Sequence, residues 1–190
     1  MNATYTCLEM RLFVGIPLVA AVIEQLEKVS MRHRVAGDGL RWSTPESWHI
    51  TLQFLGSTGE TQYECIVARL RELRAAPVSI ELDELSFFDR AGIFFAGVSL
   101  TPALLALQQQ VTAATIPCGF TSEDRPYHPH ITLARSKGRR NAIGLEDLKA
   151  KIRHQTKFGH FVADEFFLYE SFTRSEGSRY EVRERFQFAI

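Results

Sequence analysis

The sequence predicts an α+β fold with two lobes and a central cleft between them. Segments in which apolar residues alternate, as in strands, are separated by segments with helical spacing, and this order recurs in both halves of the chain. The tetrapeptide His-Ile-Thr-Leu also occurs twice, at residues 49–52 and 130–133, and so marks one strand in each half. We therefore expect a degenerate internal duplication, with mixed or antiparallel sheets flanking the cleft.

The first half predicts the order strand, helix, strand, helix, strand. An apolar strand at residues 12–16 leads into Pro17, which suits the first turn of a helix over residues 18–34. Val22, Leu26 and Val29 would form the apolar face of that helix. Patterns of the same two kinds predict short strand 40–43, strand 48–55 with the first tetrapeptide, helix 61–74 and strand 78–85.

The second half predicts a similar order. A strand at 93–100 precedes a helix that Thr101 and Pro102 open and that continues to about residue 115. The remaining segments are loop 117–129, strand 130–135 with the second tetrapeptide, basic loop 136–141, a helix near 145–154, and closing strands 161–171 and 180–188 joined by a turn at 174–178. Residues 1–9 differ in composition and are expected to form a disordered extension, which leaves residues 10–190 as a single bilobal domain.

The composition excludes several classes of function. Twenty-two basic residues balance twenty-two acidic ones, so the chain has little overall attraction for a long polyanion, and a nucleic acid would be bound at an end. The glycine-rich fingerprints of dinucleotide-binding folds and P-loops are absent. No apolar stretch is long enough to cross a membrane, and the run at residues 12–23 is interrupted by Pro17, unlike a secretory signal.

The three cysteines, Cys7, Cys65 and Cys118, suggest a compartment. They are odd in number and lack the close spacing of zinc-binding or redox motifs. This pattern favours free thiols in a reducing environment, so we expect a cytoplasmic protein.

Each tetrapeptide places a polar pair on one face of a strand. Because side chains alternate along a strand, His49 and Thr51 share one face while the apolar residues between and after them share the other. His130 and Thr132 form the same pair in the second copy. Facing each other, the copies would surround one small anionic group with two imidazoles and two hydroxyls.

That arrangement suits acid/base chemistry at a phosphate. The imidazole pKa of about 6.5 allows one histidine to accept a proton from water while the other protonates a departing ribose oxygen. Thr51 and Thr132 would donate hydrogen bonds to non-bridging phosphate oxygens. This scheme requires no metal and no cofactor.

Other interpretations of these residues stay open. A single His-x-Thr on a strand is usually structural, and only the repetition favours catalysis. His128 lies two residues before His130, and with His49 it could form a three-histidine zinc site, although Pro129 argues against a continuous strand there. The basic segment at residues 136–140 could contact phosphate or be a solvated turn.

The remaining candidates have weaker support. Cys118 could be a nucleophile, but no pattern around it favours this role. His33, His154 and His160 stand in polar or loop contexts and are expected to be structural or exposed.

The repeated motifs resemble those of the two-histidine phosphoesterase superfamily. Longer strings resemble its RNA 2′,3′-cyclic phosphodiesterase branch, also called 2′-5′ RNA ligase-like, from about Met10 to the end of the chain: residues 11–14, 49–56, 125–135 and 168–171, and the late Tyr180. The resemblance implies a bilobal α+β fold and hydrolysis of RNA 2′,3′-cyclic phosphate ends to 2′-phosphomonoesters, with 2′-5′ ligation as the reverse reaction. The substrate would be such an RNA or a related cyclic nucleotide, and we expect a monomer.

The resemblance also implies roles for individual residues. His49 would donate a proton to the O3′ leaving group, and His130 would accept one from water, although the sequence itself does not settle which histidine is the acid. Thr51 and Thr132 would bind the phosphate, and Arg135 would lie near the ligand. Strict alternation directs Arg135 away from His130, so this last role requires an irregular strand. The competing hypothesis is a non-catalytic module that binds RNA ends or nucleotides without turnover.

Overall fold

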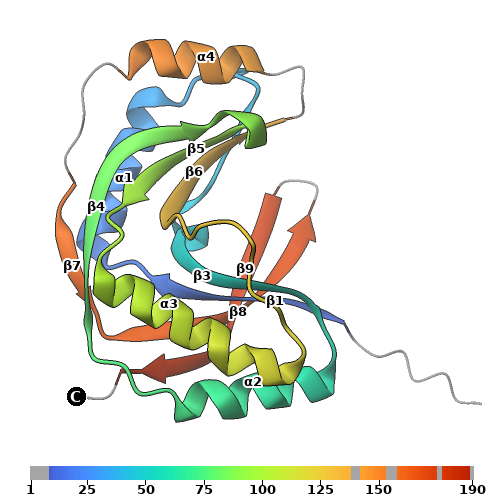
Figure 1. Ribbon diagram of the computed structural model, residues 1–190. Coiled ribbons are helices and arrows are strands. Elements are labelled where there is room, and N and C mark those ends of the chain that lie inside the picture. Colours follow the sequence, from blue (N-terminus) through green and yellow to red (C-terminus); the bar gives the residue numbers. More distant parts are fainter. Residues whose placement is uncertain (1–8, 138–141, 153–157, 175–176, 189–190) are drawn as a thin grey trace, which may run out of the picture.

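The computed structural model describes residues 9–137, 142–152, 158–174 and 177–188 (Figure 1). The described α-helices are α1 (Ala20–His33), α2 (Glu60–Glu72), α3 (Pro102–Thr115) and α4 (Ala142–Lys151). The described strands are β1 (Met10–Pro17), β2 (Leu40–Trp42), β3 (His49–Thr58), β4 (Val78–Phe88), β5 (Ile93–Val98), β6 (His130–Ser136), β7 (His160–Ala163), β8 (Glu165–Arg174) and β9 (Gly177–Gln187). The expected N-terminal extension, apart from Glu9, and residues 138–141 of the basic loop lie outside the described residues.

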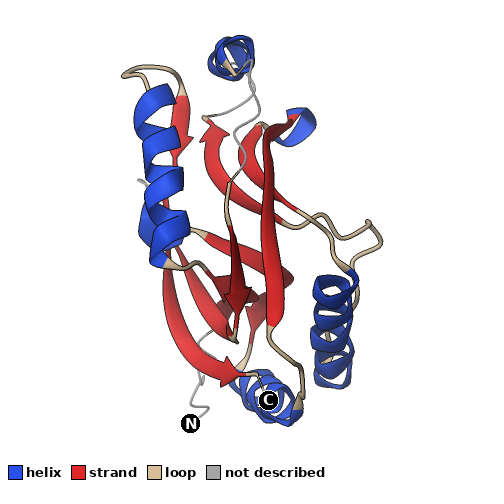
Figure 2. Ribbon diagram, turned by 90° about the vertical axis from the view of Figure 1, so that its left-hand side faces the viewer, coloured by secondary structure: helices blue, strands red, loops and turns tan. Residues whose placement is uncertain are grey.

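Two antiparallel sheets form the centre of the molecule, and the helices lie on their outer sides (Figures 1 and 2). The first sheet has the strand order β3-β1-β8-β9, and the second has the order β2-β6-β5-β4-β7. One tetrapeptide begins β3 and the other begins β6, so each sheet contains one copy. The predicted α+β, bilobal architecture with one motif strand per lobe is confirmed.

The lobes are not the two consecutive halves of the chain. β2 comes from the first half but pairs with β6 in the second sheet, whereas β8 and β9 come from the end of the chain and complete the first sheet. The predicted single strand 161–171 is wrong for the same reason, because it is two strands in different sheets. The chain changes sheets at Asp164, whose carbonyl accepts a hydrogen bond from the backbone amide of Phe188 at 2.8 Å.

The internal duplication extends beyond the tetrapeptides. β1 contains Phe13-Val14-Gly15 and pairs with β3, while β5 contains Phe95-Ala96-Gly97 and pairs with β6. Each motif strand therefore lies beside a strand with the same Phe-x-Gly order. Both glycines allow a close neighbour, because a Cβ at Gly15 would lie 3.3 Å from Cδ2 of His49 and a Cβ at Gly97 would lie 3.2 Å from Cβ of Asp83.

One large apolar core supports both sheets. The buried face of α1 consists of Val22, Leu26 and Val29, as the sequence predicted, and α3 contributes Leu104 and Leu107. Burying one such side chain stabilises the fold by about 1.5–3 kcal/mol. The motif strands add their own apolar residues to this core, so their polar faces are directed away from it.

A disulfide between Cys65 and Cys118 corrects the prediction of free thiols for these two cysteines, whereas Cys7 lies outside the described residues. It joins α2 to the short 3₁₀ turn after α3, with the two Cα atoms 5.7 Å apart and a sequence separation of 53 residues between the cysteines. Spacing rules detect only close motifs, so they could not reveal a pair formed by the packing of two helices. None of the helices in the described ranges is long and apolar enough to cross a membrane.

The disulfide leads to a prediction about stability. A covalent link across a loop of this length typically contributes about 2–4 kcal/mol, so reduction should lower the melting temperature by about 5–10 °C. Thermal unfolding with and without dithiothreitol measures this effect. In a Cys65→Ser variant the reductant should have no further effect, and equal melting temperatures for oxidised and reduced wild-type protein would contradict the prediction.

Candidate functional site

The two motif strands β3 and β6 approach each other at the junction of the lobes. His49, Thr51, His130 and Thr132 are half-buried, while the residues that alternate with them are buried in the core. The structure therefore brings together both polar pairs that the sequence predicted. A bridge also spans the junction, because the hydroxyl of Tyr127, from the loop before β6, donates a hydrogen bond to the backbone carbonyl of Thr51 at 2.9 Å.

A β-bulge interrupts β3 directly after its polar pair. Gly15 pairs with Thr51 and Val14 pairs with Gln53, so Leu52 is an extra residue on the β3 side. An extra residue inverts the alternation beyond it. Phe54 is consequently directed to the same face as His49, and its side chain is 59% exposed.

β6 carries the equivalent bulge. Phe95 pairs with Thr132 and Phe94 with Ala134, so Leu133 is the extra residue. Arg135 is therefore directed to the face of His130 instead of away from it, and its side chain is exposed. The irregularity that the role of Arg135 requires is present. Phe54 occupies the corresponding position in the other copy, and the sequence analysis missed it.

Hydrogen bonds hold the His49 ring in one orientation. Nδ1 lies 2.9 Å from the carbonyl oxygen of Ser47, and Nε2 lies 3.1 Å from Oγ1 of Thr51. Because a carbonyl can only accept, Nδ1 carries the hydrogen and Nε2 is left as the reactive nitrogen. The ring packs against Phe13, with 4.5 Å between ring centroids, and meets the ring of Tyr180 edge-on at 5.1 Å.

Burial sets the protonation of His49. It lowers the pKa of the imidazole from 6.5 to about 4, with smaller lowering contributions from the positive charges of His130 and Arg135 and an opposing contribution from the carbonyl of Ser47. The influence of His130 on this pKa places the two imidazoles within electrostatic reach of each other.

His130 is held in the same way. Its Nδ1 lies 2.8 Å from the carbonyl oxygen of His128, again the residue two positions earlier. The ring lies among Phe88 and Phe95, with centroid distances of 5.0 and 5.3 Å. Burial lowers its pKa below the usual 6.5, and the positive charges of His128 and Arg135 lower it further.

The other candidates do not join this site. Cys118 is held in the disulfide and is not available as a nucleophile. His128 is exposed, and in the described ranges no group of three or more His, Cys, Asp or Glu side chains is arranged to hold a metal ion. His160 is exposed on β7, His33 is half-buried near the end of α1, and His154 lies outside the described residues.

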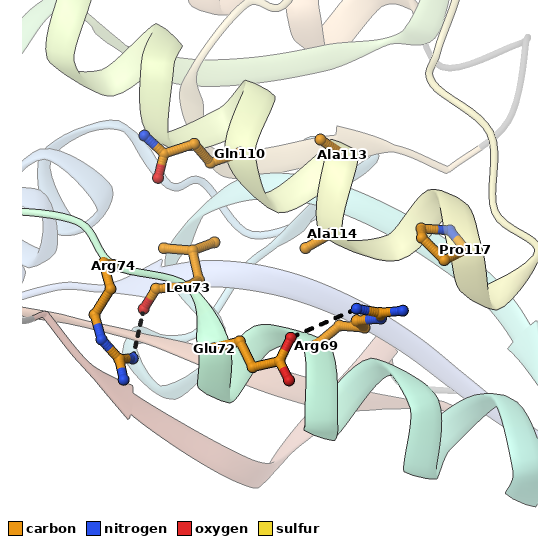
Figure 3. Close-up of a pocket in the computed structure, with 8 residues that line it drawn as sticks. All are labelled: Arg69, Glu72, Leu73, Arg74, Gln110, Ala113, Ala114 and Pro117. Carbon is orange, nitrogen blue, oxygen red and sulfur yellow. Dashed lines mark hydrogen bonds and ion pairs between the residues drawn. The ribbon is translucent and has the colours of Figure 1, made fainter.

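A hollow of about 340 Å³ between α2 and α3 is separate from the motif strands (Figure 3). Its charged groups have partners within the wall, because Arg69 forms an ion pair with Glu72 at 3.5 Å and Arg74 donates to the backbone carbonyl of Leu73 at 3.4 Å. None of the repeated residues lines it. The site formed by β3 and β6 is therefore the better candidate.

Comparisons with known proteins find relatives over most of the chain. The model of the 2′-5′ RNA ligase superfamily matches residues 17–172. An RNA 2′,3′-cyclic phosphodiesterase of Bacillus subtilis is 25% identical over 182 residues, covering 93% of this chain and 96% of the relative. Another of that name, from Aeropyrum pernix, is 35% identical over 124 residues, covering 62% of this chain and 70% of the relative.

Solved structures share the fold. Escherichia coli LigT complexed with 3′-AMP superposes with a TM-score of 0.81 at 24% identity, covering 96% of this chain and 99% of that one. The protein TT0787 of Thermus thermophilus superposes with a TM-score of 0.79 at 27% identity, covering 94% and 98% of the two chains.

The closeness of Gly15 to the His49 ring can be tested. A Cβ at Gly15 would lie 3.0 Å from the carbonyl oxygen of Ile50 and 3.3 Å from Cδ2 of His49. Gly15→Ala should therefore displace the ring towards solvent and raise the pKa of His49 from about 4 towards its usual 6.5, which NMR titration of the imidazole measures. Gly159→Ala is the control, because its Cβ would meet only Nε2 of Gln25, at 3.7 Å. An unchanged His49 titration in Gly15→Ala would contradict the close packing of Gly15 against the His49 ring and the lowering of the His49 pKa by burial.

Proposed function

Because the chain belongs to the 2′-5′ RNA ligase superfamily, we propose that it hydrolyses RNA 2′,3′-cyclic phosphate ends to 2′-phosphomonoesters. The observation that carries the proposal is the pair of imidazoles, each tied through Nδ1 to a backbone carbonyl with Nε2 left for chemistry. The names of the curated relatives support the choice of substrate. A related cyclic nucleotide would meet the same groups.

The proposed reaction divides two proton transfers between the histidines. Nε2 of His130 accepts a proton from water as the water oxygen attacks phosphorus, and Nε2 of His49 gives a proton to O3′ as the P–O3′ bond breaks. The products are a 3′-hydroxyl and a 2′-phosphate. The family resemblance supports this order of roles, and the Nδ1 hydrogen bonds suit it because a carbonyl stabilises an imidazolium.

Groups beside the two histidines would bind the phosphate and the terminal base of the substrate. The hydroxyls of Thr51 and Thr132 lie on the face of the histidines and would donate to the non-bridging oxygens, and Arg135 would add a positive charge beside them. Thr51 exchanges its contact with Nε2 of His49 for one with phosphate in this scheme. The exposed ring of Phe54 offers a surface on which the terminal base can stack.

The lowered pKa values imply that one proton arrives with the substrate. Burial keeps both imidazoles largely neutral at pH 7 in the unliganded protein. A bound phosphodiester anion between them raises their pKa values by its negative charge, which favours the imidazolium that the mechanism requires. Binding and protonation of the acid are therefore linked.

We infer that residues 10–190 act as one catalytic domain, as a monomer and without a metal or cofactor, because the two imidazoles supply both proton transfers. An RNA substrate favours the cytoplasm as the location. Ligation of 2′-5′ ends would be the reverse of the same chemistry.

Substitution of the histidines tests the proposal. His49→Ala and His130→Ala should each lower kcat for a 2′,3′-cyclic phosphate by about 10²–10⁴-fold, since each removes one proton-transfer group. The double variant should be little worse than either single one, because the two groups act as a unit. His160→Ala, the same change at an exposed position, should match wild type. Near-wild-type turnover in either active-site variant would reject the paired mechanism, and binding without turnover in wild type would indicate the non-catalytic module.

The pH dependence follows from the direction of the pKa shifts. A plot of kcat/KM against pH reports groups of the free enzyme, and the active form has one proton on the coupled pair. The pKa of His49 is lowered to about 4 and that of His130 is also lowered, so the bell-shaped curve should have its maximum below pH 6.5. The maximum of kcat should lie at higher pH, because the bound anion raises both values. A kcat/KM maximum above pH 7 would contradict the burial of the pair.

A further inference from the structure

The face that carries His130 continues across the second sheet. His130 pairs with Gly97 and Thr132 with Phe95, and Phe95 in turn pairs with Ser86 on β4. Residues paired across neighbouring antiparallel strands share a face. The surface beside the proposed acid/base pair therefore extends from β6 over β5 to β4.

A groove of about 410 Å³ lies on this extension, within the size range of small-ligand sites. The residues that line it are Asp83, Glu84, Leu85, Ser86, Phe95, Gly97, Val98 and His128. The groove adjoins the catalytic face, because the ring of His130 lies 6.5 Å from that of His128 and 5.3 Å from that of Phe95, between centroids.

The local backbone brings two carboxylates to the groove. The pairing of β4 with β5 is interrupted between Leu82 and Leu85, so Asp83 and Glu84 leave the regular ladder. Gly97 permits this approach, since a Cβ there would lie 3.2 Å both from Cβ of Asp83 and from the carbonyl oxygen of Glu84.

The two carboxylates differ in their partners. Asp83 accepts a hydrogen bond from the hydroxyl of Ser99 at 2.7 Å. For Glu84, no hydrogen bond or ion pair of its side chain is present within the described part of the chain, and the residue is exposed. Glu84 is therefore the acceptor that can turn to a ligand.

The chemistry of the groove selects the part of an RNA that it can hold. Carboxylates repel a phosphodiester, so the backbone would not lie against Asp83 and Glu84. A nucleobase that carries an exocyclic amine offers hydrogen-bond donors to a carboxylate, as cytosine does through N4. The exposed ring of His128 supplies aromatic surface for the flat base, and the buried ring of Phe95 supports that ring edge-on, with 5.7 Å between centroids.

We propose that this groove binds the base of the nucleotide on the 5′ side of the terminal, cyclic-phosphate-bearing nucleotide, and that Glu84 selects a base with an exocyclic amine. The inference rests on the proposed function. It deepens that function by assigning a sequence preference at the second position from the RNA end. The terminal base lies at the other end of the motif strands, near Phe54 and Arg135, so the two bases occupy separate places.

Two dinucleotides that differ in one group test the proposal. CpU and UpU, each ending in a 2′,3′-cyclic phosphate, share the terminal nucleotide, but cytosine carries an amine where uracil carries a carbonyl oxygen. Wild-type protein should hydrolyse the CpU substrate with a kcat/KM about tenfold higher. In Glu84→Gln the ratio should fall to about 1, because an amide can accept from cytosine or donate to uracil.

Glu81→Gln is the matched control. Glu81 is exposed on the same strand but does not line the groove, so this variant should keep the wild-type ratio. A wild-type ratio near 1, or a ratio that Glu84→Gln leaves unchanged, would overturn the inference while the hydrolysis itself supports the proposed function.

Cytidine and uridine 2′,3′-cyclic monophosphates, which have only a terminal base, show which of the two bases the groove binds. Discrimination between these monomers that Glu84→Gln abolishes would place the terminal base in the groove and also overturn the inference. Failure of wild type to hydrolyse all four compounds would reject the proposed function, and the inference with it.

Discussion

The candidate site depends on one hydrogen bond that each histidine makes to its own strand. In both copies Nδ1 donates to the carbonyl of the residue two positions earlier, Ser47 for His49 and His128 for His130. This bond fixes the ring, selects the tautomer and leaves Nε2 to face the ligand. It also opposes the lowering of each pKa by burial, so both rings can take up a proton when an anion binds. The proposed acid/base pair depends on this local geometry, which occurs twice, and on the fold that brings the two copies together.

The two β-bulges add two further side chains to the face that carries the histidines. Regular strands would leave Phe54 and Arg135 in the core or on the opposite face, whereas the extra residues Leu52 and Leu133 bring them beside the polar pairs. A site with only histidines and threonines would hold a phosphate. The aromatic ring and the guanidinium at its far end suit the nucleotide that we propose as substrate, and the hydroxyl of Tyr127 ties the loop before β6 to β3.

Much of this arrangement could be predicted from the sequence, because it depends on local periodicity. The alternation around His49 and His130 was sufficient to place both strands and to pair their polar faces, and the helical spacing of Val22, Leu26 and Val29 identified the buried face of α1. The features that escaped depend on partners distant in sequence. Bulges arise from register with a neighbouring strand, and the break at Asp164 exists because successive strands join different sheets. The Cys65–Cys118 disulfide likewise follows from the packing of two helical segments.

The most direct test of the proposed function is the identity of the product. A short RNA ending in a 2′,3′-cyclic phosphate is incubated with the protein in excess EDTA, and the end group is identified by ³¹P NMR and by its susceptibility to phosphatase. Two imidazoles that transfer protons to O3′ and from water should give a 2′-phosphomonoester at an undiminished rate. A 3′-phosphomonoester, loss of turnover in the chelator, or binding of the RNA end without hydrolysis would contradict it.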